Sequence, residues 1–114
     1  MTKKQITAVK KTVKMWEWFV NNPTKDKTDY FREHKIRGRR PICECYLCSM
    51  WYYKCYGHTS GCPLDAPGLV CNVASDNPFE EWERYQEYGD QKDAKIQAQR
   101  IVNACNRWLR KYDR

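Results

Sequence analysis

The chain has 114 residues, of which 41% are hydrophobic and 31% are charged, so it has room for one domain with one modest core. Because it holds no run of about 18 to 20 apolar residues and no leader-like segment, we expect neither a membrane span nor secretion, and a cytoplasmic location. The formal net charge of +7 favours anionic partners: nucleic acid, a nucleotide or an acidic protein surface.

The first half of the chain carries two predicted helices. Apolar residues three and four positions apart predict an amphipathic helix over Thr2–Asn22, which Pro23 ends; its predicted buried stripe is Ile6, Val9, Val13, Trp16 and Val20. A shorter helix is predicted over Asp29–Ile36, with Tyr30 and Phe31 near His34 and an end at Gly38.

Two further helices are predicted after residue 76. The first runs from Pro78 to about Tyr88, with Gly89 as its terminator, and the second from Asp93 to about Tyr112. The second has a predicted buried stripe of Ala94, Ala98, Ile101, Cys105, Trp108 and Tyr112, supplemented by Val102 and Leu109. Since neither terminal helix can bury its stripe alone, we expect them to pack together in a mainly α, single domain over residues 1–114. Its parts are helical residues 1–38, a cysteine-rich module at 39–75 and helical residues 76–114.

The cysteine-rich module predicts a structural zinc site. Six of the seven cysteines lie between residues 43 and 71, and an odd total argues against a fully paired disulfide framework. Zinc prefers four thiolate or imidazole ligands, and a Cys-x-x-Cys turn presents two of them. The preferred set is Cys45, Cys48, Cys62 and Cys71, with Cys55, His58 and Cys43 as alternates. Buried thiols, two disulfides and thiol redox chemistry at Cys45 and Cys48 are the competing interpretations.

Basic and aromatic residues alternate around this module and suggest an anion site. Arginine binds phosphates in pairs of hydrogen bonds, and aromatic rings stack on bases. The expected ligand contacts are Arg37, Arg39, Arg40, Tyr53 and Lys54. In the competing interpretation, residues 51–56 only cover the zinc site and the arginines are solvated. A second basic set, on the last helix, is expected to face solvent: Arg100, Arg107, Arg110, Lys111 and Arg114.

Several segments together resemble small phage and prophage proteins of uncharacterised function. The matching segments are Trp16–Trp18, Asn22–Pro23, Lys27–Phe31, the Cys45 and Cys48 pair, Cys62–Leu64, Cys71 and Pro78–Trp82. The gap before Cys62 is longer than is usual in that group, which leaves Cys55, His58 and Cys71 as competing ligands. The resemblance implies a phage origin and an accessory role against host defences in the bacterial cytoplasm.

Two functions follow from these patterns, and neither is catalytic. In the first, the protein sequesters a phosphorylated, nucleotide-type ligand in the arginine and aromatic site, which the interface of a homo-oligomer would enclose. Changing Arg39 and Arg40 to Ala would then abolish ligand binding without lowering the zinc content. In the alternative, an open basic surface binds nucleic acid or a host protein. An enzyme is not expected, because only His34 and His58 are available and no nucleophile or phosphate-binding motif is recognisable.

Overall fold

A computed structural model describes residues 2–34, 46 and 78–113 of the chain. The helices in these residues are α1 (Lys3–Asn21), α2 (Lys27–Glu33), α4 (Pro78–Tyr88) and α5 (Gln91–Tyr112). The prediction of a mainly helical protein is therefore confirmed for the described part of the chain. The predicted zinc module lies outside it. Of the four helices, none is both long enough and apolar enough to cross a membrane.

Local capping chemistry sets where α1 begins and ends. The Thr2 hydroxyl accepts a hydrogen bond from the backbone N–H of Gln5, and the Gln5 side chain accepts one from the backbone N–H of Thr2, both at 3.1 Å. This reciprocal capping box satisfies two of the backbone donors that a helix start leaves unpaired. At the other end, the N–H of Asn22 donates to the carbonyl of Phe19, and Pro23 follows. The predicted bounds of this helix are confirmed to within one residue.

The starts of α2 and α5 differ from the prediction because of aspartate caps, and the end of α2 differs as well. Helix α2 begins at Lys27 because the Asp26 carboxylate accepts the N–H of Asp29, and it ends at Glu33, three residues earlier than predicted. Helix α5 begins at Gln91 rather than Asp93 because Asp90 is the residue that caps it. A carboxylate four residues ahead of an apolar stripe is a better marker of a helix start than the stripe itself.

Between α4 and α5 the chain reverses through Gly89, as predicted. Gly89 has a φ of +73°, in the left-handed region that glycine adopts without steric cost. The N–H of Asp90 donates to the carbonyl of Tyr85 at 2.8 Å, and the N–H of Gly89 donates to that of Gln86 at 3.2 Å. This pair of bonds is a Schellman motif, which satisfies the last carbonyls of α4. Asp90 can therefore cap α5 immediately.

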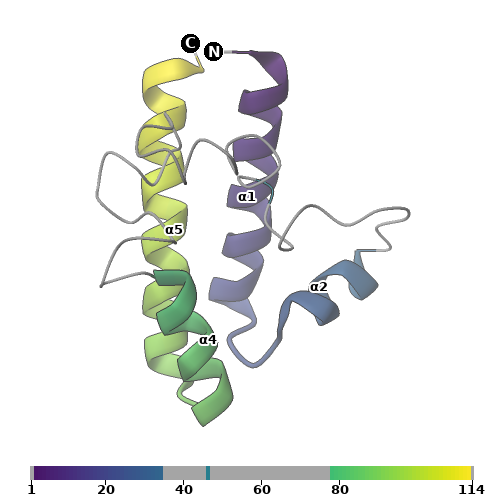
Figure 1. Cartoon of the computed structure of the whole chain (residues 1–114), viewed down its shortest axis with the longest axis vertical. Coiled ribbons are helices and arrows are strands. Elements are labelled where there is room, and N and C mark those ends of the chain that lie inside the picture. The colour runs from purple at the N-terminus through teal and green to yellow at the C-terminus, as the bar shows by residue number, and fades with distance from the viewer. Residues whose placement is uncertain (1, 35–45, 47–77, 114) are drawn as a thin grey trace.

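The two long helices lie side by side and antiparallel, with both chain ends at the same end of the molecule (Figure 1). Helix α4 packs on α5 near the opposite end. As predicted, five of the apolar residues expected to be buried on α5 are buried: Ala94, Ala98, Ile101, Cys105 and Trp108. Tyr112 is 38% exposed, so the expectation that it is buried was wrong: it lies in the last turn of α5.

The buried face of α1 is rotated from the predicted stripe. Val9 and Trp16 are fully buried as expected, but Ile6, Val13 and Val20 are only half-buried at its edge. The other buried positions are Ala8, Thr12, Met15 and Phe19. Burial of Thr12 leaves its hydroxyl hydrogen-bonded, because the hydroxyl donates to the Ala8 carbonyl at 2.8 Å.

Aromatic rings from helices α1, α2 and α4 form one cluster. Trp16 and Phe19 of α1 lie 4.9 and 4.8 Å from Trp82 of α4, measured between ring centroids, and Phe19 lies 5.9 Å from Tyr30 of α2. Tilted and edge-to-face ring pairs at these distances each add about 0.5–1.5 kcal/mol beyond simple burial. This aromatic cluster holds α2 and α4 against the long helices.

Candidate functional site

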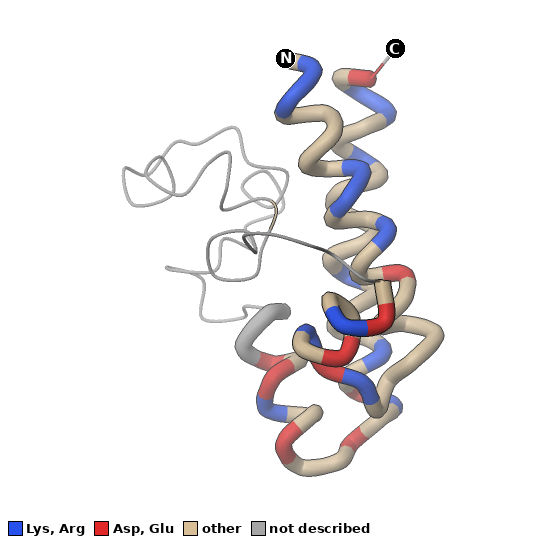
Figure 2. The backbone as a smooth tube through the Cα atoms, turned by 90° about the vertical axis from the view of Figure 1, so that its right-hand side faces the viewer, with Lys and Arg blue, Asp and Glu red and all other residues tan. Residues whose placement is uncertain are grey.

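Charge divides the described part of the molecule into two ends. We define the basic end as residues 2–15 and 96–113, and the acidic end as residues 16–34 and 78–95. At the basic end a single acidic residue, Asp113, accompanies nine cations: Lys3, Lys4, Lys10, Lys11, Lys14, Arg100, Arg107, Arg110 and Lys111. The acidic end has six cations and ten acids: Glu17, Asp26, Asp29, Glu33, Glu80, Glu81, Glu83, Glu87, Asp90 and Asp93. Figure 2 shows this separation along the two long helices.

Five lysines of α1 form what we term the lysine stripe: Lys3, Lys4, Lys10, Lys11 and Lys14. All five are exposed. With 3.6 residues per turn they fall on one side of α1, away from its buried face, over a length of about 16 Å at 1.5 Å per residue. Between residues 2 and 16 there is no acid in the sequence. A charged helix surface that only kept the protein soluble would ordinarily mix both signs.

The charge of this stripe is only slightly offset within the described residues. Lys10 pairs with Asp113 at 3.0 Å, but both side chains are well exposed, and exposed pairs are worth about 0–1 kcal/mol. The ammonium group of Lys11 lies 5.6 Å from the ring centroid of Tyr46. An aromatic ring attracts the ammonium group but does not neutralise the charge of Lys11. The lysine stripe is therefore a concentrated positive surface.

The stability of α1 does not explain the lysines at its start. The N-terminus of a helix carries a partial positive charge, so a lysine in the first turn is unfavourable by about 0.3–1 kcal/mol. Helix α1 has Lys3 and Lys4 there and no acid, whereas α2 has Asp29 and α5 has Asp93 in the same place. The chain thus places an acid in the first turn of α2 and of α5, as the helix dipole favours, but places lysines in the first turn of α1, where the lysine stripe begins. Such local departures are typical of functional surfaces.

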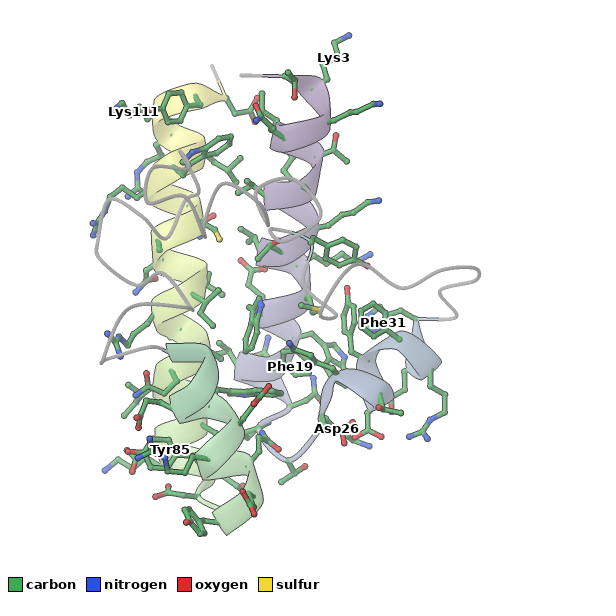
Figure 3. The ribbon with its side chains drawn as sticks, viewed as in Figure 1. Lys3, Phe19, Asp26, Phe31, Tyr85 and Lys111 are labelled. Atoms are coloured by element: carbon green, nitrogen blue, oxygen red, sulfur yellow. The ribbon has the colours of Figure 1, made fainter. Side chains whose placement is uncertain are left out.

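A second basic surface, the α5 stripe, consists of Arg107, Arg110 and Lys111. All three are exposed, as the sequence predicted. Arg110 and Lys111 lie in the last turn, where positive charge stabilises the helix, so they have a structural explanation as well. The neighbouring Arg100 is only half-buried and donates to the Gln97 side chain at 2.8 Å. In Figure 3, Lys3 and Lys111 point away from the helix pair on different sides.

A shallow pocket of about 240 Å³ opens at the acidic end between the start of α2 and α4. Its lining combines both charges with one aromatic residue: Asp26, Lys27, Thr28, Trp82, Glu83 and Gln86. The Gln86 side chain donates to the Pro23 carbonyl, which ties α4 to the loop after α1. Sequence reasoning missed this pocket because it joins segments more than fifty residues apart, and no local pattern indicates such a contact.

His34 is the one histidine among the described residues, and its role is structural. Its Nδ1 lies 2.9 Å from the Tyr30 carbonyl, and its ring lies 4.1 Å from the Tyr30 ring, as expected from their spacing. Burial raises the pKa of the Tyr30 hydroxyl, with a further contribution from Tyr46, so Tyr30 stays neutral at pH 7. These contacts cap α2 and position its rings against Trp18.

The residues predicted to bind zinc or an anion lie outside the described part of the chain. The predicted zinc ligands and alternates are Cys43, Cys45, Cys48, Cys55, His58, Cys62 and Cys71, and the predicted anion contacts are Arg37, Arg39, Arg40, Tyr53 and Lys54. These assignments stay predictions. Within residues 2–34, 46 and 78–113, no three His, Cys, Asp or Glu side chains are grouped so that they could hold a metal ion.

Comparison of the chain with protein-family models, with curated proteins and with solved structures finds no match. The resemblance to small phage proteins therefore also stays a prediction.

Proposed function

We propose that the protein is a non-catalytic binder of double-stranded nucleic acid, and that the lysine stripe of α1 is its main contact. The observation that carries this proposal is the segregation of charge: nine cations and one acid at the basic end, with five exposed lysines on one side of one helix. Duplex DNA has one negative charge per about 1.7 Å of its axis, so five lysines on one side of a helix meet a row of phosphates of the same length.

Lysine as the contact residue indicates binding without sequence recognition. An ammonium group on a flexible stem acts as a point charge toward phosphate, whereas base recognition uses the paired donors of Arg, Asn or Gln in a groove. A single strand would instead need aromatic rings for its bases to stack on. The exposed aromatic side chains in the described residues, Tyr88 and Tyr112, lie outside the lysine stripe. A duplex is therefore the better partner.

The expected strength follows from counterion release. Lys10 is engaged with Asp113, which leaves four lysines for phosphates: Lys3, Lys4, Lys11 and Lys14. Four phosphate contacts give a slope of about −3.6 for the logarithm of the association constant against the logarithm of salt concentration. Between about 50 and 200 mM salt, the affinity then falls by about 100-fold. An acidic host protein would show a weaker salt dependence.

This proposal develops the open-surface alternative drawn from the sequence. It is compatible with two predictions made from the sequence, which stay predictions. These are a structural zinc site at Cys45, Cys48, Cys62 and Cys71, and an accessory role in phage infection. Sequestration of a nucleotide by Arg37, Arg39, Arg40, Tyr53 and Lys54 is the competing hypothesis, and the same experiment separates the two.

The test is a salt titration of a short fluorescent duplex with two matched double variants. Lys3→Gln/Lys4→Gln removes two charges from the lysine stripe, and Lys92→Gln/Lys95→Gln removes two from exposed positions of the acidic end. Glutamine keeps a high helix propensity, so folding is preserved. We expect the first variant to reduce the salt slope by about 2 and the affinity by at least about tenfold, and the second to change neither.

A third variant, Arg39→Ala/Arg40→Ala, decides between the surfaces. If this variant abolishes binding while Lys3→Gln/Lys4→Gln binds like the wild type, the lysine stripe is not the contact. A wild-type protein that binds no duplex at about 50 mM salt would also overturn the proposal.

A further inference from the structure

The two basic surfaces face different sides of the helix pair. Helices α1 and α5 lie side by side, and each carries its cations away from its own buried face. Figure 3 shows the consequence at the end where the chain termini meet: Lys3 extends from α1 on one side and Lys111 from α5 on the other. The lysine stripe and the α5 stripe therefore do not form one continuous surface.

The distance between the two surfaces matters for what they can bind. An α-helix with its side chains is about 10–12 Å across, so two helices side by side separate their outer surfaces by about 20 Å. The Debye length at physiological salt is about 8 Å. Two duplexes held on opposite sides would therefore repel each other little.

One duplex cannot use both surfaces at once. To reach from one side to the other it would have to turn round a body with dimensions of 36 × 33 × 25 Å. Bending a site of 20–30 base pairs by only 40–90° already costs about 1–6 kcal/mol. The α5 stripe offers three exposed charges in return, which is too little for a sharper bend. A second, separate duplex meets no such cost.

Resting on the proposed function, we infer that the protein is bivalent: it bridges two duplex segments, one on the lysine stripe of α1 and one on the α5 stripe. The acidic end supports this arrangement. Its ten acids outnumber its six cations, so the acidic end repels phosphates and each duplex is confined to the basic end (Figure 2). Crosslinking of duplexes, rather than coating of one duplex, is the expected activity.

The test measures capture of a second duplex. Protein is bound to a duplex immobilised on beads, unbound protein is washed away, and a fluorescent duplex of the same sequence is added at low salt. Two variants each remove three charges from one surface: Lys3→Gln/Lys4→Gln/Lys11→Gln and Arg107→Gln/Arg110→Gln/Lys111→Gln. The matched control is Lys92→Gln/Lys95→Gln.

We expect each single-surface variant to bind the immobilised duplex more weakly than the wild type, through its remaining basic surface, and to lose about tenfold or more of the captured fluorescence per retained protein molecule. The control should capture as the wild type does. Substituting Arg107 and Arg110 by Lys, which keeps the charge, should preserve capture and shows that the loss is electrostatic. A helical circular dichroism spectrum establishes that the variants are folded.

Three outcomes would overturn the inference. A wild-type protein that binds the first duplex but captures no second one is monovalent. If either single-surface variant captures normally, self-association of the protein through one surface explains bridging instead. If the wild type binds no duplex at all, the proposed function fails first, and the retained protein on the beads distinguishes that case from the others.

Discussion

The two ends of the molecule are built on different principles. At the acidic end, rings from three helices gather around Phe19, which is fully buried and lies within 6 Å of Trp16, Trp18, Tyr30 and Trp82 between ring centroids. At the basic end, Met15 and Trp108 are the largest buried side chains, and the others are smaller: Ala8, Val9, Thr12, Ala98, Ile101, Val102, Ala104 and Cys105. Aromatic burial is therefore concentrated where the surface charge is mixed.

The ends also differ in how their helices begin. Helix α2 and helix α5 start at the acidic end with an aspartate cap and an acid in the first turn. Helix α1 starts at the basic end with a threonine cap and two lysines. This difference indicates that the acidic end favours helix stability, whereas the basic end favours positive charge. The following substitutions test this division between the two ends.

The largest effect is expected from the aromatic cluster. Phe19→Ala should lower the free energy of unfolding by about 3–5 kcal/mol, because it removes a buried ring and leaves a cavity among its neighbours. Val9→Ala, at the basic end, should cost less, about 2 kcal/mol. Chemical denaturation measures both, with Tyr88→Ala as the control, since Tyr88 is 74% exposed. Equal losses for Phe19 and Val9 would contradict the division.

A smaller effect of opposite sign is expected at the start of α1. Lys4→Glu should raise the free energy of unfolding by about 0.5 kcal/mol at low salt, because a carboxylate in the first turn complements the helix dipole. The same change should weaken duplex binding more than Lys4→Gln does, since it adds repulsion. A thermal melt and a salt titration of the two variants measure these effects. If Lys4→Glu destabilises the protein, the lysines are needed for the fold and not only for binding.

The smallest effects are expected from two aspartates with opposite pKa shifts. The backbone N–H of Asp26 lowers the pKa of Asp29 from its ordinary value of 3.8. Its contribution to stability is present above the unfolded-state pKa and is lost as the pH falls through the lowered value. Hydrogen bonding to the Asp90 side chain and partial burial raise the pKa of Asp93 above 3.8, with repulsion from Asp90 contributing. The folded state therefore gains stability as the pH falls through the raised value.

Unfolding curves of two amide variants separate these cases. Asp29→Asn should destabilise the protein at pH 7 and lose this effect near pH 2. Asp93→Asn should be neutral or slightly stabilising at pH 7. Since both groups are only partly buried, the changes should be small and should shrink at high salt. An equal, pH-independent loss for both variants would mean that their roles are only steric.

Much of the helical frame could be predicted because its signals are local. The apolar periodicity, the Pro23 that follows α1, the Pro78 that begins α4 and the Gly89 that ends α4 each act within one or two turns of chain. They predicted the bounds of α1 and α4 closely. The starts of α2 and α5 were predicted two residues late, because the apolar pattern was followed instead of the caps Asp26 and Asp90.

The candidate site could be predicted only in part. The cations of α5 were expected to face solvent, and an open basic surface was one of the two predicted functions, but that surface was not assigned to α1. The pocket beside Trp82 was missed, since it joins the Asp26 loop to α4. The zinc and arginine assignments between residues 37 and 71 stay predictions.

The sequence by itself determined the mainly helical class, most helix ends and the buried stripe of α5, because caps and periodicity depend on neighbours along the chain. Only the tertiary structure decided that Phe19 and Met15 lie on the buried face of α1, while Ile6 and Val13 lie at the edge of that face. It also decided that the acids gather at one end and that the two basic stripes face different sides. Helical periodicity relates residues on one helix, whereas the rotation of that helix against its neighbours depends on which side chains pack best between them.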